Sequence, residues 1–239
     1  MKKTLAYLFG ALALFGCGGG GGGNGSSSDA RVAYVNASPD AGDLAFSLND
    51  TRKASGLGLG EVSSFGKVGD GSYDVSIGTE GDPETIASEQ ETFGQNTDSL
   101  VLALGLRTTT DDEREKRLQI AVGSVDREAL TGNRARIVLV NALVRATDQD
   151  STPVDFRNPV TSPAISAASI GYGEVRSIDI DSGTQSFEAR QTGTEGALIA
   201  STPLTFAAGR VYLVLISGRE GATDATIAPS FRVVELPTR

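Results

Sequence analysis

The stretch RVAYVNA, residues 31 to 37, decides the fold of this chain because it returns almost unchanged as RIVLVNA at residues 136 to 142. Two other stretches recur in the same order: GLGEVSSF (58 to 65) returns as GYGEVRSI (171 to 178), and TFGQNTDSLVLALG (92 to 105) returns as TFAAGRVYLVLISG (205 to 218). Each unit is about 100 residues long, the size of an independent domain rather than of a solenoid repeat. The sequence therefore predicts two tandem domains, residues 29–125 and 126–239, with a joint at residues 124 to 134.

Within each unit the side chains alternate with the period of a β-strand. GSYDVSIG (71 to 78) places Tyr73, Val75 and Ile77 on one side, and RVAYVNA alternates in the same way, so both are predicted to be half-buried strands. SLVLALGL (99 to 106) and VYLVLISG (211 to 218) are apolar throughout, which is typical of a central strand covered on both faces. The pattern predicts an all-β chain of two antiparallel β-sandwiches, immunoglobulin-like in architecture.

The first 28 residues have the layout of an exported, lipid-anchored protein. Lys2 and Lys3 precede a mostly apolar run from Leu5 to Leu14, which is too short to span a bilayer. The only cysteine, Cys17, follows in LFGC, which resembles the lipobox of bacterial lipoproteins at its apolar, small and cysteine positions. That resemblance implies a signal peptide over residues 1–16 and acyl chains, such as palmitate, on Cys17.

Residues 17–28 would then hold the folded part near a membrane. GGGGGGNGSSS (18 to 28) offers no side chains to pack, so we expect a flexible tether after the lipidated cysteine. Gly18 stands where inner-membrane lipoproteins of Gram-negative bacteria carry Asp, and this resemblance implies the outer membrane. Both the periplasmic and the surface face of that membrane stay open.

Three stretches of the first unit resemble a known family. They are RVAYVNASPDAGDLAFSLN (31 to 49), GEVSSFGKVGDGSYDVSIG (60 to 78) and SLVLALG (99 to 105), and together they resemble the domain of unknown function family numbered 4397. The resemblance covers nearly all of residues 29–125 and weakens in the second unit, where NALVRATDQDSTPVDF (141 to 156) replaces the opening loop. Members occur in secreted and lipid-anchored bacterial proteins, often as repeats, and membership implies no activity.

Composition excludes several classes of function. The formal net charge of −9 disfavours binding to nucleic acids and to anionic lipid headgroups. The chain has no histidine, which excludes Ser-His-Asp triads and removes the commonest ligand of transition metals. We therefore expect neither an enzyme nor a bound cofactor.

Two motifs resemble functional ones and are interpreted as structural. Ser64 and Lys67 form an S-x-x-K pair, but they lie on a predicted strand rather than a helix, and the S-D-N and K-T-G partner motifs are missing. The glycine-rich GLGLGEV (56 to 62) precedes a strand instead of joining a strand to a helix, so it does not predict a dinucleotide site. Its glycines recur in the second unit, which favours bulges or close backbone approach.

One loop of the second unit is dense in carboxylates, namely Asp148, Asp150 and Asp155, and Asp40 and Asp43 occupy the equivalent loop of the first unit. Carboxylates on one loop can bind calcium. An EF-hand is excluded because prolines stand where its glycine and bidentate glutamate belong. A calcium site is one interpretation, and a solvated acidic loop is the favoured one.

Three polar pairs, Arg31/Arg136, Glu61/Glu174 and Asn36/Asn141, recur in both units, which indicates that they serve the fold. We expect a non-catalytic, lipid-anchored envelope protein that binds or spaces an unidentified ligand, with a protein or a glycan of the envelope as its partner. The alternatives are a periplasmic or surface hydrolase that uses carboxylates, and a structural component of a surface assembly.

Overall fold

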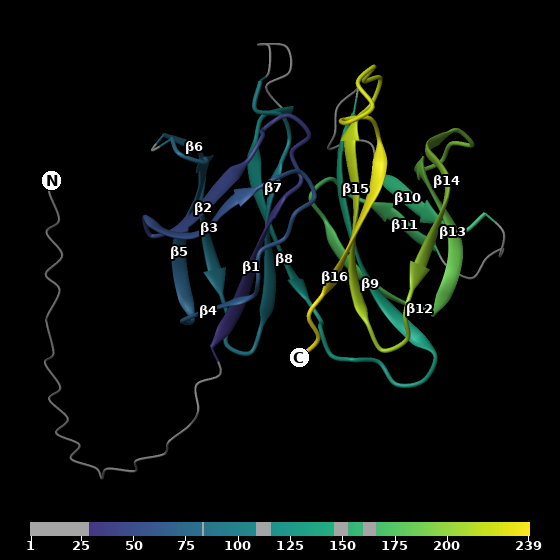
Figure 1. Ribbon diagram of the computed structural model, residues 1–239, viewed down its shortest axis with the longest axis horizontal. Helices are drawn as coiled ribbons and strands as arrows, with labels where there is room; N and C mark the ends of the chain where they lie inside the picture. The colour runs from purple at the N-terminus through teal and green to yellow at the C-terminus, as the bar shows by residue number, and fades with distance from the viewer. Residues whose placement is uncertain (1–28, 83, 109–115, 146–152, 160–165) are drawn as a thin grey trace, which may run out of the picture.

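The computed structural model describes residues 29–239 except 83, 109–115, 146–152 and 160–165, and the regular elements in these ranges are all β-strands. They form four four-stranded sheets that stand side by side as two sandwiches (Figure 1). The predicted all-β chain of two tandem sandwiches is confirmed. None of the described segments is a helix that is long and apolar enough to cross a membrane.

Sandwich 1 contains β1 (Ala30–Asn36), β2 (Leu44–Leu48), β3 (Thr51–Leu57), β4 (Gly66–Val68), β5 (Gly71–Thr79), β6 (Thr85–Phe93), β7 (Asp98–Leu104) and β8 (Gln119–Val125). Sandwich 2 contains β9 (Arg134–Val144), β10 (Val154–Arg157), β11 (Ser166–Ile170), β12 (Val175–Asp181), β13 (Gly183–Gln191), β14 (Ala197–Phe206), β15 (Val211–Arg219) and β16 (Ser230–Leu236).

The two sandwiches have the same strand order. The inner sheet of sandwich 1 is β4-β1-β7-β8 and that of sandwich 2 is β12-β9-β15-β16, while the outer sheets are β3-β2-β5-β6 and β11-β10-β13-β14. Most neighbours are antiparallel, but β1 pairs with β7 and β9 with β15 in parallel. The sequence pattern does not predict these parallel pairs. They arise because the chain crosses to the outer sheet and back between the two strands, which then run in the same direction.

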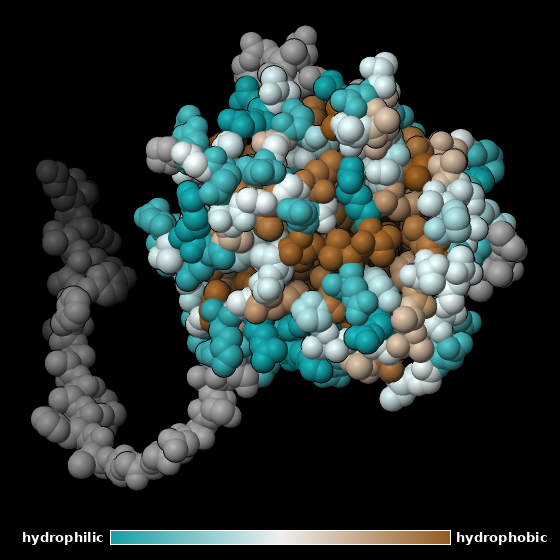
Figure 2. Space-filling model, viewed as in Figure 1, coloured by the Kyte–Doolittle hydropathy of each residue, from teal (hydrophilic) through white to brown (hydrophobic). Residues whose placement is uncertain are grey.

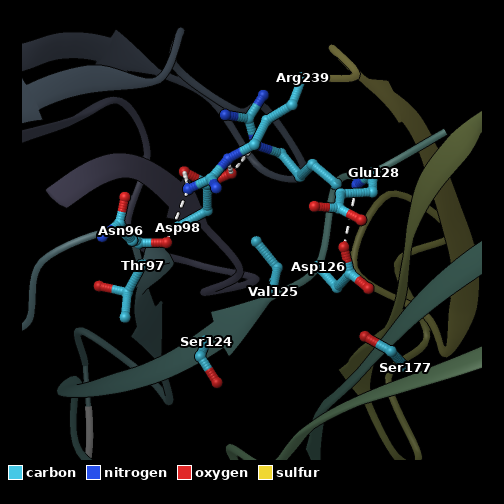
Figure 3. A pocket seen from close by; sticks show the side chains of 10 residues that line it. Asn96, Thr97, Asp98, Ser124, Val125, Asp126, Glu128, Ser177 and Arg239 are labelled. Carbon is cyan, nitrogen blue, oxygen red and sulfur yellow. Dashed lines mark hydrogen bonds and ion pairs between the residues drawn. The ribbon is translucent and has the colours of Figure 1, made fainter. Parts of the chain in front are cut away.

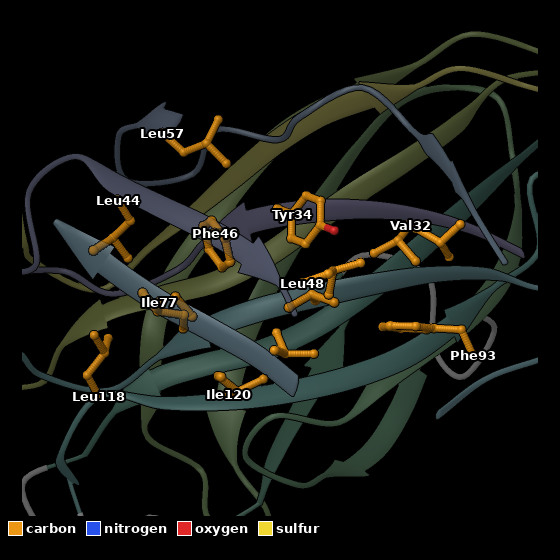
Figure 4. Packing of buried hydrophobic residues seen from close by; sticks show 14 of the residues in the cluster. Val32, Tyr34, Leu44, Phe46, Leu48, Leu57, Ile77, Phe93, Leu118 and Ile120 are labelled. Carbon is orange, nitrogen blue, oxygen red and sulfur yellow. The ribbon is translucent and has the colours of Figure 1, made fainter. Parts of the chain in front are cut away.

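Each sandwich has its own apolar core. In sandwich 1 the large side chains of both sheets, including Tyr34, Phe46 and Phe93, point into the space between them (Figure 4). Sandwich 2 is filled by aromatic rings: Phe156 stacks on Phe187 with ring centroids 4.5 Å apart. The alternation predicted for GSYDVSIG is confirmed, because Val75 and Ile77 are buried while Ser72 and Asp74 are exposed.

A third apolar core lies between the sandwiches, where the two inner sheets pack face to face. It contains side chains from the central strands β1, β7, β9 and β15, for example Val35, Leu102, Val140 and Leu213. The apolar runs at 99 to 106 and 211 to 218 are therefore covered on both faces, as predicted. β1 is not half-buried, as its alternation predicts, because Ala33, Val35 and Ala37 face sandwich 2.

The contacts between the sandwiches are reciprocal. The turn before β4 touches β16, where a Cβ on Gly60 would lie 2.7 Å from the side chain of Arg232. The matching turn before β12 touches sandwich 1, where a Cβ on Gly173 would lie 3.0 Å from Leu104. Corresponding parts of each sandwich thus contact the other, as in the self-complementary interface of a two-fold dimer. Figure 2 shows apolar residues gathered in the middle of the face that includes this seam.

Both sandwiches point the same way. Residue 29, the turn 94–97, the joint 126–133 and residues 237–239 lie together at one end, which we call the tether end (Figure 1). The connections 37–43, 58–61, 171–174 and 219–229 lie at the opposite end, which we call the loop end. The two ends are separated by the length of the strands.

The closest approach across the seam gives a test of the third core. A Cβ on Gly123 of β8 would lie 2.4 Å from the Cβ of Val175 on β12, and rotation of that valine cannot relieve the clash. We expect Gly123→Ala to lower the free energy of unfolding in urea by about 1–3 kcal/mol, because the sheets must move apart.

The matched control is Gly66→Ala on β4, where the nearest atom to the new Cβ is 4.0 Å away. We expect it to change the stability by less than about 0.5 kcal/mol. Equal effects of the two substitutions would contradict the packing described for the seam.

Candidate functional site

A cavity of about 490 Å³ opens between the sandwiches at the tether end. It is lined by Asn96, Thr97, Asp98, Ser124, Val125, Asp126, Arg127, Glu128, Ser177 and Arg239 (Figure 3). These residues come from β7, β8, the joint, β12 and the C-terminal segment. Cavities between domains are common ligand sites, so the chemistry of this lining decides what it can do.

The centre of the lining is a buried carboxylate held by two arginines. The side chain of Asp98 is 1% exposed, and its Oδ2 accepts hydrogen bonds from Nε of Arg127 at 2.7 Å and from Nε of Arg239 at 2.9 Å. Oδ1 accepts a further bond from Nη2 of Arg239 at 2.9 Å. Charge-assisted bonds of this kind are among the strongest in proteins.

Both arginines join segments that are distant in the sequence. The guanidinium of Arg127 also donates to the carbonyl of Pro237 and lies over the ring of Phe65, 3.8 Å from its centroid. Arg239 donates from its backbone to the carbonyl of Arg127 at 3.1 Å and from Nη2 to the carbonyl of Asn96 at 2.9 Å. The cluster therefore ties sandwich 1, the joint and the C-terminal segment together.

This environment makes Asp98 a poor catalyst. Burial would raise the pKa of its carboxyl, but the hydrogen bonds and charges of Arg239 and Arg127 outweigh burial and hold the pKa below its usual range. The carboxylate stays ionised and both of its oxygens accept bonds from the arginines, so it is poorly suited to act as a base or a nucleophile. The arrangement is suited to fixing the two sandwiches relative to each other.

The sequence pattern does not predict this cluster, although the internal repeat contains a signal for it. Asp98 pairs with Arg31 in β1 as Val211 pairs with Arg136 in β9, so an aspartate stands where the second unit has valine. Because the corresponding residue of the second unit is apolar, the charge of Asp98 indicates a role that is specific to sandwich 1. Its partners, 29 and 141 residues away, cannot be predicted from spacing.

The recurring glycines, glutamates and asparagines build the same turn twice. The backbone N–H of Gly58 donates to Oε2 of Glu61 at 2.8 Å, and that of Gly171 donates to Glu174 at 2.8 Å. Asn36 donates to the carbonyl of Leu57 at 2.8 Å, and Asn141 donates to that of Ile170 at 3.0 Å. These residues serve the fold in both units.

The third recurring pair, Arg31 and Arg136, has diverged. Arg136 pairs with Asp126 of the joint and donates from Nε to Oδ1 of Asp179 at 2.8 Å. These contacts anchor the joint to sandwich 2. The corresponding Arg31 lies directly beside Asp98 in the register of the inner sheet of sandwich 1.

Three of the calcium candidates lie within the described residues, whereas Asp148 and Asp150 fall outside them. Asp40 accepts hydrogen bonds from the backbone N–H groups of Arg107, at 2.7 Å, and Thr108, at 3.2 Å. Asp43 is exposed at the loop end. No group of three potential metal ligands comes together among the residues that the structure describes.

Asp155 is buried on β10 in sandwich 2, away from Asp40 and Asp43. Its Oδ1 accepts hydrogen bonds from Thr192 Oγ1 at 2.6 Å and from the backbone N–H of Ser169 at 2.8 Å, and its Oδ2 accepts one from Arg157 at 2.9 Å. Burial would raise its pKa, but these bonds outweigh burial and hold the pKa below its ordinary range. Its oxygens are therefore engaged in holding the strand β11.

In the S-x-x-K pair, the side chain of Lys67 forms an ion pair at the protein surface. Nζ of Lys67 lies 3.4 Å from Oδ2 of Asp29, and the lysine side chain is largely exposed. Cys17, the predicted lipid attachment site, falls outside the described residues.

One carboxylate pair bears on the hydrolase alternative. Glu89 and Glu91 stand two residues apart on the edge strand β6, and Glu91 occupies the position that Leu204 has in β14. Burial, and then the charge of Glu89, raise the pKa of Glu91. The two side chains lie next to each other on one strand rather than facing each other across either described cavity.

Comparisons with known proteins bear on the family and the fold. The profile of a domain of unknown function, DUF4397, matches residues 30–150, which cover sandwich 1 and the beginning of sandwich 2. A search of curated proteins finds no match.

Solved structures show distant likenesses. The Bacillus anthracis TIE protein is 7% identical with a TM-score of 0.25, and the match covers 81% of this chain and 34% of that one. A candidate cell adhesion protein from Bacteroides eggerthii is 10% identical with a TM-score of 0.28, and the match covers 91% of this chain and 98% of that one. This chain spans about a third of the length of the first protein. At such low TM-scores neither likeness bears on function.

The Asp98 cluster yields a prediction for stability and its pH dependence. Asp98→Asn leaves the buried guanidinium of Arg127 and the partly exposed one of Arg239 without their counter-charge, so we expect the free energy of unfolding at pH 7 to fall by about 3–5 kcal/mol. The lowered pKa of Asp98 means that its contribution is present above the unfolded pKa, about 3.9, and is lost as the pH falls through the lower folded pKa.

Urea unfolding from pH 7 to pH 2.5 measures both effects. The gap between the parent protein and Asp98→Asn should be widest at neutral pH and should narrow below about pH 4. Asp70→Asn, at an exposed position of the same end, is the control and should change stability by less than about 0.5 kcal/mol. A gap that is independent of pH would show that the charge of Asp98 is not what stabilises the junction.

Proposed function

This chain belongs to the DUF4397 family of domains of unknown function, and on that premise we propose that it is a non-catalytic, lipid-anchored protein of the bacterial cell envelope. Its two sandwiches act as one rigid spacer that presents the loop end to a protein or glycan partner. The carboxylate hydrolase and the surface-assembly component are the rival functions.

The observation that carries this proposal is the common direction of the two sandwiches. The tether would enter at residue 29, at the tether end, and the longer connections of both sandwiches emerge at the opposite end (Figure 1). The longest strand, β9, has 11 residues, which at roughly 3.3 Å per residue spans about 36 Å. A membrane anchor at Cys17 would therefore place the loop end outward, away from the lipid.

The contacts between the sandwiches support a rigid spacer. The third apolar core and the Asp98 cluster join them along their length and at the tether end. Connections at the end of a rigid sandwich are common positions for binding residues, because the scaffold fixes them while their sequence varies. The buried carboxylates Asp98 and Asp155 are taken up by structural partners, which supports a role without catalysis.

Acylation of Cys17 is the first test. We expect cells that express the full chain to incorporate a palmitate analogue into it and to carry it in the outer-membrane fraction, because the lipobox directs lipid to this thiol. Cys17→Ser should abolish the labelling, and Ser26→Ala in the tether should leave it intact. Recovery of the parent protein without acyl chains would refute the anchor.

The second test asks which end of the two sandwiches contacts a partner. Ala225→Cys places a thiol at the loop end and Ala129→Cys places one in the joint at the tether end, both at exposed positions. With a thiol-linked photo-crosslinker in intact cells, we expect a discrete crosslinked product from Ala225→Cys and none from Ala129→Cys. Crosslinks mainly to further copies of this chain would favour the surface-assembly role, and products from the tether end alone would contradict presentation by the loop end.

A further inference from the structure

A second cavity, of about 430 Å³, lies at the loop end of sandwich 1, where β6 meets the ends of β7 and β8. It is lined by Ile86, Leu106, Arg107, Thr108, Arg117 and Leu118. Residues 109–115, which connect the two sides of the cavity in sequence, lie outside the described residues, and the site is defined without them. The lining combines an apolar surface with two cations.

The apolar part of the lining continues the core of sandwich 1. Leu106 and Leu118 are almost fully buried, and Leu118 belongs to the main core cluster, against which Ile86 packs. An apolar group that enters the cavity would therefore contact the half-buried Ile86 and the edges of Leu106 and Leu118. Such a surface favours a ligand with an apolar portion.

The frame around the cavity is rigid. The backbone N–H of Leu106 donates to the carbonyl of Lys116 at 2.6 Å, and that of Leu118 donates to the carbonyl of Leu106 at 2.8 Å. Gly105 has φ of +90°, and a Cβ there would lie 2.3 Å from the carbonyl oxygen of Arg117, so only glycine allows this approach. Asp40 fixes the other side by accepting from the N–H groups of Arg107 and Thr108.

Two positive charges line this cavity, and no described residue supplies their counter-charge. Among the described residues the lining contains no carboxylate, and the exposed guanidiniums of Arg107 and Arg117 have no hydrogen bond or ion pair with any of these residues. By contrast, Arg127, Arg136 and Arg239 are all paired with aspartates. In a chain with a net charge of −9, two unpaired arginines on an apolar surface indicate a place for an anion.

We propose that this cavity binds an amphipathic carboxylate: Arg107 and Arg117 hold the carboxylate, and the hydrocarbon lies on Ile86, Leu106 and Leu118. The guanidinium fork matches a carboxylate in geometry, and the Thr108 hydroxyl is a further donor in the same lining. Two sources share this chemistry, namely a medium-chain fatty acid and the free carboxyl end of an apolar peptide. The inference goes beyond the proposed function and does not depend on the lipid anchor.

Binding of octanoate to the purified full chain, measured by isothermal titration calorimetry, tests the proposal. We expect saturable binding of octanoate, and binding of 1-octanol that is at least about tenfold weaker, because the alcohol lacks the charge that the arginines hold. The double variant Arg107→Gln, Arg117→Gln should weaken octanoate binding by at least about tenfold and leave octanol binding unchanged.

The matched control is Lys53→Gln, which removes one exposed positive charge from β3 of the same sandwich and should bind octanoate like the parent. Circular dichroism of each variant confirms that the sandwiches are intact. Absence of saturable octanoate binding, equal binding of the alcohol, or unchanged binding in the double variant would overturn the proposal. Loop-end crosslinking in cells is a separate readout, so its failure would affect the proposed function and not this site.

A further arm distinguishes the two sources of the carboxylate. N-acetyl-leucyl-leucine with a free carboxyl group is compared with its amide and with octanoate. Tighter binding of the peptide acid than of octanoate assigns the site to peptide ends, and the reverse order assigns it to fatty acids. Equal binding of the acid and the amide would contradict a carboxylate site.

Discussion

The packing of the two inner sheets against each other is the constraint on which the rest of the structure depends. It buries the second face of β1, β7, β9 and β15, so that each central strand contributes to two cores. Burial of apolar area is the main stabilising term available to a chain whose described part contains no cysteine and no group of three potential metal ligands. It also aligns the sandwiches, and this alignment brings Asp98 within reach of Arg239 and places both sets of turns at one end.

Comparison of the two copies separates what the fold needs from what each copy has changed. The turn built by Gly58, Glu61 and Asn36 is retained in detail, and a bulge in the outer sheet recurs with its backbone at positive φ in Gly56 and Ser169. The bulge is held differently in each copy. Gly56 donates to Glu80, whereas Ser169 donates to Asp155. The same left-handed conformation is thus held by a different carboxylate in each copy, and this accounts for the position of Asp155.

Much of the fold follows from the local sequence, because alternation and apolar runs report burial directly. The runs at 99 to 106 and 211 to 218 predict strands covered on both faces, and the repeat predicts two sandwiches. At residues 33 to 37 the pattern is misleading because Ala33 and Ala37 are small, so a face that packs against another sheet resembles one that meets water. The second copy is eight residues longer than the first between these repeats, and the extra residues fall in two places. The offset between copies is 105 at Asn36 and Asn141, 110 at Phe46 and Phe156, and 113 at Ala54 and Ala167.

The Asp98 cluster and the arginine-lined cavity depend on pairings between distant segments, which spacing along one chain does not encode.

The reciprocal seam has a consequence for how the molecule behaves when it is scarce. A self-complementary interface between separate subunits comes apart on dilution, since association depends on concentration. Here the short joint between Val125 and Arg134 keeps the two halves at a high effective concentration. The pair therefore stays assembled however few copies are present, and each copy of the chain carries its own dimer.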